Sequence, residues 1–455
     1  MNDVVAHGDV VLPPGPGVPK VLQGAVAITC RREALRLLRQ RYGPDFTVRL
    51  PIFGRTVVVS DPQHVRQVLK AAPAELDTVE QNLGRVMGPN SLFALRGDQH
   101  RQQRKLLTPS FNGRRLRAYE DLIEQEAWRE FATWPHNSEF ATMPSMMRIT
   151  LNVILRAVFG ADGVQLERLR QLVPRLVELG SMLALVPVPQ WDFGSLSPWG
   201  RFHRYRRTYD DIVGELVDAA LADERLTERD DVLALMVQSL YDDGSTMTRE
   251  AIADQLVTLL SAGHETTATT LAWAIERLRR HPQVLDRLVD EIDSGKQDYL
   301  DATLTEVQRS RPVIDSAFRS VVPSSYDLGD WVLPRGQLIL VGIGLVHDDA
   351  AVYERPEAFD PDRFTDDRPD TSLWLPFGGG VRRCIGAAFA SLEMKVVLRT
   401  LLRGFTLEPT TDRGERWHSR GVALAPARGA RAVVRPRADA GQVLDVATAL
   451  PATRC

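Results

Sequence analysis

One cysteine stands in an unusual chemical setting: Cys384, in the stretch PFGGGVRRCIGAAFA (376–390). Three glycines (378–380) precede it. Glycine has no side chain and adopts conformations closed to other residues, so this turn can approach a planar ligand closely. Residues 385–402 follow with a helical pattern, which puts the cysteine at the amino-terminal edge of a helix, beside free backbone N–H groups. A cysteine that only fills the core would not need this setting.

The helix end alone cannot turn this cysteine into a thiolate. A helix dipole contributes about 0.3–1 kcal/mol, and ~2 at most, whereas one pKa unit corresponds to about 1.4 kcal/mol. The thiol pKa would therefore fall from about 8.5 by little more than one unit. A bound metal deprotonates a coordinating thiol outright. Because no neighbouring histidine or second cysteine offers zinc further ligands, the natural metal carrier is a macrocycle that supplies its own four nitrogens.

A second candidate region lies in the longest helical segment, residues 248–282. Thr248 is a suitable N-cap, and two arginines and a proline mark the end. At 1.5 Å per residue this helix is about 50 Å long and could cross the whole protein. Its middle, AGHETT (262–267), contains a glycine and threonines that weaken the helical preference and can bend a helix.

Two short motifs are ambiguous by themselves. HETTA (264–268) lacks the second histidine of the zinc-protease motif H-E-x-x-H, because position 268 is alanine. The alternative is a core helix that carries polar residues, although a buried and unpaired carboxylate at Glu265 would be costly. Glu306 and Arg309 lie at i and i+3 of a helix, where a surface ion pair worth at most about 1 kcal/mol is the default interpretation.

The composition excludes several classes of protein. The 455 residues are 44% hydrophobic and 25% charged, as in a soluble globular protein with a large core. The net charge of -3 argues against a general nucleic-acid binder. Three widely separated cysteines fit neither a disulfide framework nor a zinc site. No run approaches the ~20 apolar residues of a membrane span, and residues 21–28 do not form a signal peptide. We therefore expect a cytoplasmic protein without a transmembrane anchor.

The elements that must position these residues are mostly helical. The helical period dominates residues 61–291, while strand-like segments occur at 46–60, 331–343 and 421–436. This layout predicts a mainly α protein of the α+β class, with small segregated sheets. No linker divides the chain, so we expect a single domain over residues 1–455. Within it, we expect a Pro/Gly-rich extended lead-in (1–20) and a loosely ordered tail (437–455).

Taken together, the motifs resemble the cytochrome P450 family, in their order and approximate spacing, from the lead-in to about Pro436. The haem signature F-x-x-G-x-R-x-C-x-G is matched by Phe377, Gly380, Arg382, Cys384 and Gly386. The oxygen-activation motif A-G-x-[DE]-T is matched by Ala262, Gly263, Glu265 and Thr266. The E-x-x-R pair is matched by Glu306 and Arg309, and the FDPDRF segment contains Arg363. The resemblance implies a P450 fold with haem between the long central helix and the cysteine loop.

The same resemblance implies a cofactor and its ligands. The cofactor is haem b (iron protoporphyrin IX), with Cys384 as the axial iron ligand and Phe377 shielding the sulfur. A thiolate ligand pushes electron density toward the iron and favours O–O cleavage. The residues implied to hold the haem propionates are Arg382, Arg319, His100 and Arg104. His100 departs from the tryptophan that is common at its position in the family.

The remaining motif residues receive roles in the same way. Glu265 and Thr266 would handle protons on the side of the haem where dioxygen binds, and Ala262 and Gly263 would lie against the haem. General acid–base participation typically contributes about 10²- to 10⁴-fold to a rate. The network of Glu306, Arg309 and Arg363 would be structural and would support the cysteine loop.

The resemblance implies a monooxygenase that hydroxylates or epoxidises a hydrophobic small organic molecule: a lipid, steroid, terpenoid or aromatic compound. Two apolar segments (86–95 and 180–193) would line its pocket. Because the sequence ends soon after the haem region, we expect electrons from a separate ferredoxin or flavodoxin with an NAD(P)H-dependent reductase. The basic stretch 96–117, with Arg383, is either a solvated face or a docking patch for an acidic ferredoxin. Charge reversal at Arg114 and Arg115 would distinguish the two.

Two alternatives use the same residues differently. A peroxygenase or isomerase on this fold would not need external electrons, and the retained pair Glu265 and Thr266 disfavours it. A haem protein that binds a ligand without turnover would leave that pair idle. We expect no nucleic-acid partner in either case.

Overall fold

The structure is a computed structural model that describes residues 10–51, 53–79, 82–111, 113–160, 163–185 and 191–438. The start of the predicted lead-in and nearly all of the predicted tail lie outside the described residues. Residues 10–19 contain no helix. They are joined to the rest of the protein by an isolated bridge between Val11 and Val332, and by hydrogen bonds that Thr47 donates to the carbonyls of Pro13 and Pro14. The extended lead-in therefore ends where the first helix begins, at Lys20.

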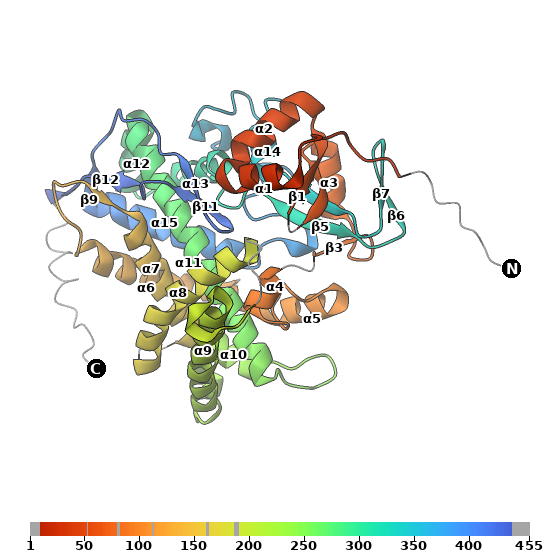
Figure 1. Ribbon diagram of the computed structural model, residues 1–455. Helices are drawn as coiled ribbons and strands as arrows, with labels where there is room; N and C mark the ends of the chain where they lie inside the picture. Colours follow the sequence, from red (N-terminus) through yellow and green to blue (C-terminus); the bar gives the residue numbers. More distant parts are fainter. Residues whose placement is uncertain are drawn as a thin grey trace.

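Helices form most of the described chain (Figure 1). The α-helices are α1 (Lys20–Thr29), α2 (Arg31–Tyr42), α3 (Pro62–Lys70), α4 (Asn82–Met87), α5 (Gly97–Leu107), α6 (Arg114–Phe131), α7 (Met143–Phe159), α8 (Val164–Leu185), α9 (Pro198–Leu221), α10 (Val232–Gln238), α11 (Arg249–Arg280), α12 (Pro282–Asp293), α13 (Asp298–Ser310), α14 (Ile343–His347) and α15 (Ala387–Gly404). Short 3-10 helices are η1 (Thr108–Phe111), η2 (Gly194–Leu196), η3 (Leu226–Glu228), η4 (Pro361–Phe364) and η5 (Gly380–Arg382).

The strands form small separate sheets, as predicted. A five-stranded sheet has the order β1-β2-β8-β5-β3, and four two-stranded pairs are β10-β11, β12-β4, β13-β9 and β6-β7. The strand bounds are β1 (Asp45–Leu50), β2 (Gly54–Val59), β3 (Leu76–Asp77), β4 (Phe140–Ala141), β5 (Ala317–Val321), β6 (Ser325–Leu328), β7 (Trp331–Pro334), β8 (Leu338–Val341), β9 (Phe405–Leu407), β10 (Trp417–Arg420), β11 (Ala423–Pro426), β12 (Arg431–Ala432) and β13 (Val434–Pro436). The predicted hairpin within 46–60 is confirmed by the antiparallel pairing of β1 with β2.

The long central helix is confirmed as α11, which runs through the middle of the molecule with α7 and α15 beside it (Figure 1). The Thr248 side chain caps it by accepting a hydrogen bond from the backbone N–H of Ala251. Almost all of its residues are buried because other helices surround it. The residues of α11 that are not buried lie at its two ends, at Arg249, Glu250 and Arg280, and near its middle, at Ala262, Gly263 and Thr266.

The two largest apolar clusters of the described residues form the cores next to the site. The larger core surrounds α11 and includes the fully buried Trp273. A smaller core lies between the five-stranded sheet and α3, around Val57 and Ile339. Each fully buried large apolar side chain contributes about 1.5–3 kcal/mol relative to exposure. The site described next lies where elements from both cores meet, because the cysteine loop contacts α3 while α15 packs on α11.

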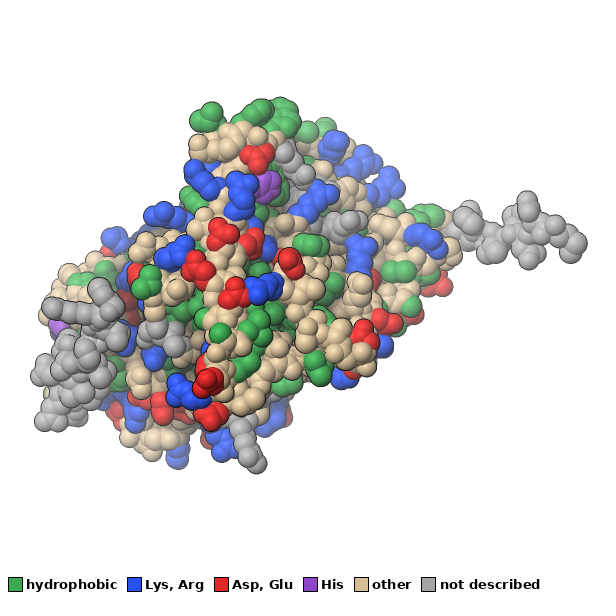
Figure 2. Space-filling model, turned by 90° about the horizontal axis from the view of Figure 1, so that it is seen from below, with side chains coloured by type: hydrophobic (Ala, Val, Ile, Leu, Met, Phe, Trp, Pro, Cys, Tyr) green, Lys and Arg blue, Asp and Glu red, His purple; other side chains and the backbone are tan. Residues whose placement is uncertain are grey.

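The outer surface carries charges of both signs. Figure 2 shows Lys and Arg side chains interspersed with Asp and Glu on the face seen from below, where α9 and α10 lie. This mixture agrees with the small net charge. Among the described residues, no helix combines the length and the apolar character needed to cross a bilayer.

Candidate active site

The cysteine loop is a tight turn between η5 and α15. The backbone N–H of Cys384 donates to the carbonyl of Phe377 at 2.8 Å and closes the turn. Gly378 and Gly380 both have φ of +64°, a conformation that favours glycine. A Cβ at position 380 would lie 1.9 Å from the carbonyl oxygen of Leu69, at the end of α3. The glycines therefore serve the turn and its contact with α3, rather than only the approach of a planar ligand.

The Cys384 side chain is exposed, and yet burial raises the pKa of its thiol. The exposure and the raised pKa are compatible because a sulfur at the wall of an internal cavity contacts solvent and is still surrounded by protein. The backbone N–H of Gly386 and the charges of Arg104 and Arg383 act in the opposite direction and lower this pKa, but burial outweighs them. Helix α15 begins at Ala387, slightly later than predicted. The protein groups alone therefore do not produce a thiolate, which agrees with a metal as its cause.

The exposed residues of α11 indicate a second wall of an internal hollow. Ala262, Gly263 and Thr266 are spaced i, i+1 and i+4 and share one face of the helix. The Thr266 hydroxyl donates to the Ala262 carbonyl at 2.7 Å. Its oxygen keeps lone pairs that can accept a hydrogen bond. The predicted A-G-x-[DE]-T residues thus leave a short open stretch in a helix that is otherwise packed on all sides.

The four predicted propionate-binding residues lie together. Burial and the charges of Arg382, Arg104 and Arg319 together lower the pKa of His100 to about 4. His100 and Arg104 come from α5, Arg319 from β5, and Arg382 from η5. Burial and the charge of Arg382 also lower the pKa of Arg319, to about 10. Guanidinium groups gathered in a partly buried place suit a ligand with carboxylates.

An acidic residue that the motifs did not indicate lies in the same cluster. Arg382 donates through Nη2 to Oδ1 of Asp77 at 2.7 Å, and the backbone N–H of Gly97 donates to Oδ2 at 3.3 Å. Arg382 also donates to the carbonyls of Leu92 and Leu95. With His100 neutral, the four predicted residues carry three guanidinium charges, and Asp77 pairs with one of them, Arg382. The cluster therefore keeps a net positive charge, which suits a ligand with carboxylates.

The three residues of the predicted charge network lie together, and two of them, Glu306 and Arg309, are fully buried. Arg309 forms two parallel hydrogen bonds of 2.6 Å with the carboxylate of Glu306, and both side chains are 0% exposed. Arg309 also donates to the carbonyls of His347 and Ala358. Arg363 lies 3.8 Å from the Glu306 carboxylate. The pair is therefore not the surface ion pair that is the default for its spacing.

His347 is a second functional residue that the sequence did not reveal. Its Nδ1 lies 3.1 Å from the Arg309 carbonyl, so Nδ1 carries the proton and donates. Its Nε2 accepts from the backbone N–H of Leu375 at 2.9 Å. Burial lowers the pKa of His347 to about 3, so the ring is neutral. His347 thus joins the Glu306–Arg309 pair to the chain just before Phe377.

Glu265 does not share the open face of α11. Its side chain is buried, and Nε of Arg420 donates to its Oε1 at 3.0 Å. Burial raises the pKa of Glu265, and Arg420 opposes this. The two residues of the predicted acid–alcohol pair therefore point to different surroundings: Thr266 toward the open stretch, and Glu265 toward the end of β10.

The basic stretch 96–117 divides into interior and surface residues. Arg104 belongs to the buried cluster. The exposed Arg101 and Lys105 form ion pairs with Asp98 at 3.0 Å and Asp242 at 2.8 Å, which reduces the local positive charge. Arg117 and Arg383 are exposed. The side chains of Arg114 and Arg115 lie outside the described part of the chain.

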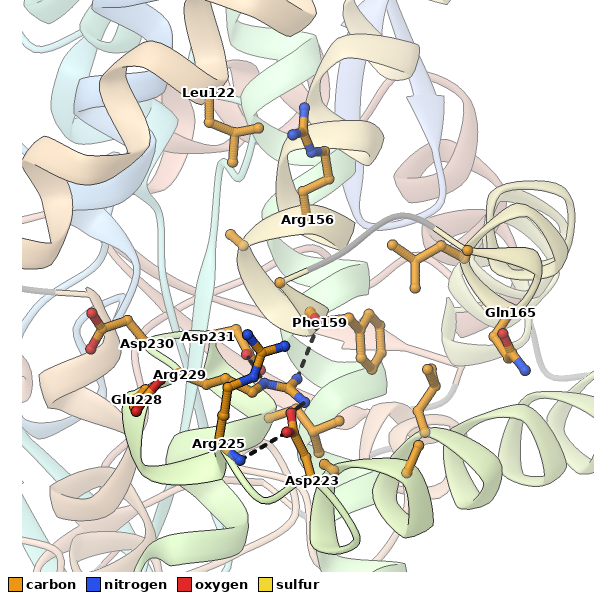
Figure 3. A pocket seen from close by; sticks show the side chains of 18 of the residues that line it. Leu122, Arg156, Phe159, Gln165, Asp223, Arg225, Glu228, Arg229, Asp230 and Asp231 are labelled. Atoms are coloured by element: carbon orange, nitrogen blue, oxygen red, sulfur yellow. Dashed lines mark hydrogen bonds and ion pairs between the residues drawn. The ribbon is translucent and has the colours of Figure 1, made fainter. Parts of the chain in front are cut away.

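A separate pocket of about 1050 Å³ contains none of the predicted site residues. It lies between the ends of α7 and α9 and the turn after α9 (Figure 3). There Arg229 pairs with Asp231 at 2.8 Å and donates to the carbonyl of Phe159 at 3.3 Å. These charges hold the turn onto α7, so we attribute a structural role to them and place the chemistry at the cysteine loop and α11.

Comparison with known proteins gives consistent matches over almost the whole chain. The sequence model of the family described as Cytochrome P450 matches residues 13–430. Cytochrome P450 138 of Mycobacterium tuberculosis (strain ATCC 25618 / H37Rv) is 53% identical over 426 residues, which cover 94% of this chain and 97% of that protein. Cytochrome P450 135B1 of Mycobacterium bovis is 39% identical over 440 residues, covering 94% and 92%.

Solved structures show the same fold. The retinoic acid-bound cyanobacterial CYP120A1 has a TM-score of 0.83 at 24% identity, covering 94% of this chain and 100% of that one. The haem domain of cytochrome P450DA has a TM-score of 0.81 at 21% identity, covering 94% and 99%. At these identities the likeness concerns the fold. In this fold the haem lies between the long central helix and the cysteine loop. The exposed residues in the middle of α11 and the exposed Cys384 side chain belong to these two elements.

Proposed function

Because this chain belongs to the cytochrome P450 family, whose members are generally haem b monooxygenases, we propose that it inserts one atom of dioxygen into a hydrophobic small molecule by hydroxylation or epoxidation. The predicted family, fold and cofactor are confirmed. The observation that carries the proposal is the combination of an accessible Cys384 sulfur with an open stretch of α11 at Ala262 and Thr266.

The residues of the chain divide the work. Cys384 would bind the iron, and the Gly386 N–H would stabilise negative charge on its sulfur, because it lowers the pKa of the thiol. His100, Arg104, Arg319 and Arg382 hold the two propionates. Bound haem supplies dioxygen activation, which a thiolate ligand favours by donating electron density to the iron. Thr266 would hold its hydroxyl at the open stretch of α11, and Glu265 would supply protons to that stretch from its buried position.

The substrate is expected to be apolar or amphipathic. In the segment 86–95, Val86 and Met87 are buried, and at the end of α8, Leu183 and Ala184 are buried. We propose, from the resemblance to the family, that both segments line the substrate pocket. Residues 186–190 of the second predicted segment lie outside the described residues. Apolar walls with few polar groups suit a hydrophobic molecule. Lipid, steroid, terpenoid and aromatic compounds share this property.

Substitution of Thr266 tests the proposed reaction. With a ferredoxin and reductase supplying electrons, Thr266→Ala should lower product formation by about 10²-fold or more and divert electrons into released peroxide. Thr258→Ala is the control, because Thr258 lies on the same helix and donates to the Asp254 carbonyl in the same way. Equal product per electron in Thr266→Ala and the unaltered protein would refute the proton-delivery role. Full activity with peroxide alone would favour the peroxygenase alternative.

We propose a separate acidic ferredoxin or flavodoxin as the electron donor, docking near Arg117 and Arg383. Arg117→Glu should slow reduction of the haem, and the slowing should shrink at high salt because screening weakens steering. Arg55→Glu, an equal charge change on the exposed start of β2, should leave reduction unchanged. An unaltered rate in Arg117→Glu at low salt would rule out this docking site.

A further inference from the structure

The turn of the β10–β11 hairpin contacts both α8 and α11. Arg420, the last residue of β10, pairs with Glu265 of α11 at 3.0 Å. The same residue accepts a hydrogen bond through its backbone carbonyl from the hydroxyl of Ser181 on α8, at 3.3 Å. The Ser181 hydroxyl in turn accepts from the backbone N–H of Val422 at 3.2 Å. The Ser181 hydroxyl thus forms hydrogen bonds with Arg420 and Val422, the residues on either side of Gly421 in the turn.

The turn fits closely against α8. Gly421 has φ of +83°, and a Cβ at this position would lie 2.5 Å from the Ser181 hydroxyl and 2.8 Å from its carbonyl oxygen. Any side chain here would therefore push the hairpin away from α8. On its other side the hairpin is fixed to α11, because the indole N–H of Trp273 donates to the carbonyl of Leu424 at 3.0 Å.

The ion pair can open. The Arg420 side chain is 34% exposed, so water can solvate its guanidinium when it leaves the carboxylate, whereas Glu265 is only 9% exposed and has no such replacement. The charges that act on Glu265 are those of Arg420 and, from α8, Glu178. The neighbouring His264 is buried, and its pKa is lowered to about 4, so it is neutral. The state of Glu265 therefore depends on the hairpin and on α8.

We infer that Arg420 is the positioning residue for Glu265. We also infer that the hydrogen bonds of Ser181 with the hairpin turn make the Arg420–Glu265 ion pair depend on the position of α8. This inference rests on the proton-delivery role proposed above for Glu265. With the turn seated on α8, Arg420 holds the carboxylate toward the hairpin and favours its ionised form. A shift of α8 that loosens the turn releases the carboxylate. The carboxylate then takes up a proton from the solvent that reaches Arg420 and, by rotating away from the hairpin, passes this proton toward the open stretch at Thr266. Proton supply is thereby coupled to the helix whose end contributes to the substrate pocket.

The first test compares two arginines of the same hairpin. Arg420→Ala removes the opposing charge, so burial raises the pKa of Glu265 further and the carboxyl stays protonated to higher pH. In the haem-loaded protein, the infrared C=O band of the protonated carboxyl should persist to a pH about one unit higher, and the alkaline limb of kcat should move the same way. Arg416→Ala removes an exposed charge at the start of the hairpin and should change neither. An unshifted infrared titration in Arg420→Ala overturns the inference.

Two further variants separate this inference from the proposed function. Ser181→Ala should shift the same titration in the same direction by a smaller amount, and no shift would refute the link to α8. Glu265→Gln should remove the band and abolish the effect of both other substitutions. One outcome separates the two claims: the band shifts in Arg420→Ala, but kcat and peroxide release are unchanged in Glu265→Gln. This outcome would support the positioning of Glu265 by Arg420 and would refute the proton-delivery role of Glu265.

Discussion

The cysteine side and the α11 side of this site are built differently. Below the cysteine loop, Glu306 and Arg309 are 0% exposed, and they are tied to the loop through the neutral ring of His347. On α11, the equivalent acid, Glu265, has one charged hydrogen-bond partner, and that partner is partly exposed. A fully desolvated network of ion pairs and hydrogen bonds fixes one geometry, whereas an ion pair that reaches water can exchange its partner for water. The ligand side is thus rigid, and the proton-handling side can change its state.

The largest expected effect tests the rigid side. Arg309→Ala removes both short hydrogen bonds to the buried Glu306 carboxylate and leaves it only the Asp360 N–H at 3.0 Å and Arg363 at 3.8 Å. Loss of the main partner of a buried charge should lower the free energy of unfolding by about 3–5 kcal/mol. Denaturant titration of the haem-loaded protein measures it. Asp301→Ala is the matched control on the same helix, because its pair with Lys395 is solvent-exposed and worth at most about 1 kcal/mol. Similar losses in both variants would contradict the difference between buried and exposed pairs.

The second prediction concerns the pH dependence of the free energy of unfolding, which His347 on the cysteine side of the site should affect. The pKa of His347 is lowered to about 3 in the folded protein, below about 6.5 in the unfolded chain. The unfolded chain therefore binds a proton that the folded protein does not, so the stability from this residue is complete above pH 6.5 and decreases as the pH falls toward 3. His347→Gln should remove up to about 1.4 kcal/mol per pH unit from this slope.

Unfolding measured from pH 6.5 to 5 provides the test. His418→Gln, an exposed histidine on β10, should keep the slope of the unaltered protein. An unchanged slope in His347→Gln would mean that this ring does not hold the loop in its neutral form.

The part of the site that the sequence predicted is the part encoded locally. The capped ends of α11, the turn before Cys384 and the i, i+3 pair of Glu306 and Arg309 follow from neighbours in the chain, and all are present. Arg420 lies 155 residues from Glu265, and no spacing rule connects them. The residue that pairs with a buried acid depends on how elements distant in the sequence pack together. This packing is determined by many core residues and not by a local motif.

The propionate cluster shows the same limit. His100, Arg104, Arg319 and Arg382 were expected from the resemblance, but Asp77 carries no motif and was missed. Its position follows from β3 pairing with β5, which also carries Arg319. The glycines before Cys384 show a related limit. The sequence predicts a close approach of a planar ligand to this turn, and the structure adds a close contact of Gly379 and Gly380 with Leu69 of α3. A sequence pattern can indicate that a tight approach is needed without showing what approaches.

The smallest expected effect concerns this cluster. Asp77→Asn leaves one more positive charge beside the haem, so the reduced state should be favoured and the midpoint potential should rise. A tenfold change in the ratio of reduced to oxidised haem corresponds to 59 mV, and we expect at most about this shift because the cluster is only partly buried. Spectroelectrochemistry measures it. Asp370→Asn, which removes the surface partner of Arg66, should leave the potential unchanged. A lower potential in Asp77→Asn would contradict the charge balance.

The central claim is that the Cys384 sulfur binds the haem iron as a thiolate, and the absorption spectrum of the carbon monoxide complex of the reduced protein tests it most directly. The account predicts the strongly red-shifted band of a thiolate-ligated haem, lost in Cys384→Ala. A spectrum like that of a histidine-ligated globin, or a protein that stays colourless after haem is added, would contradict it.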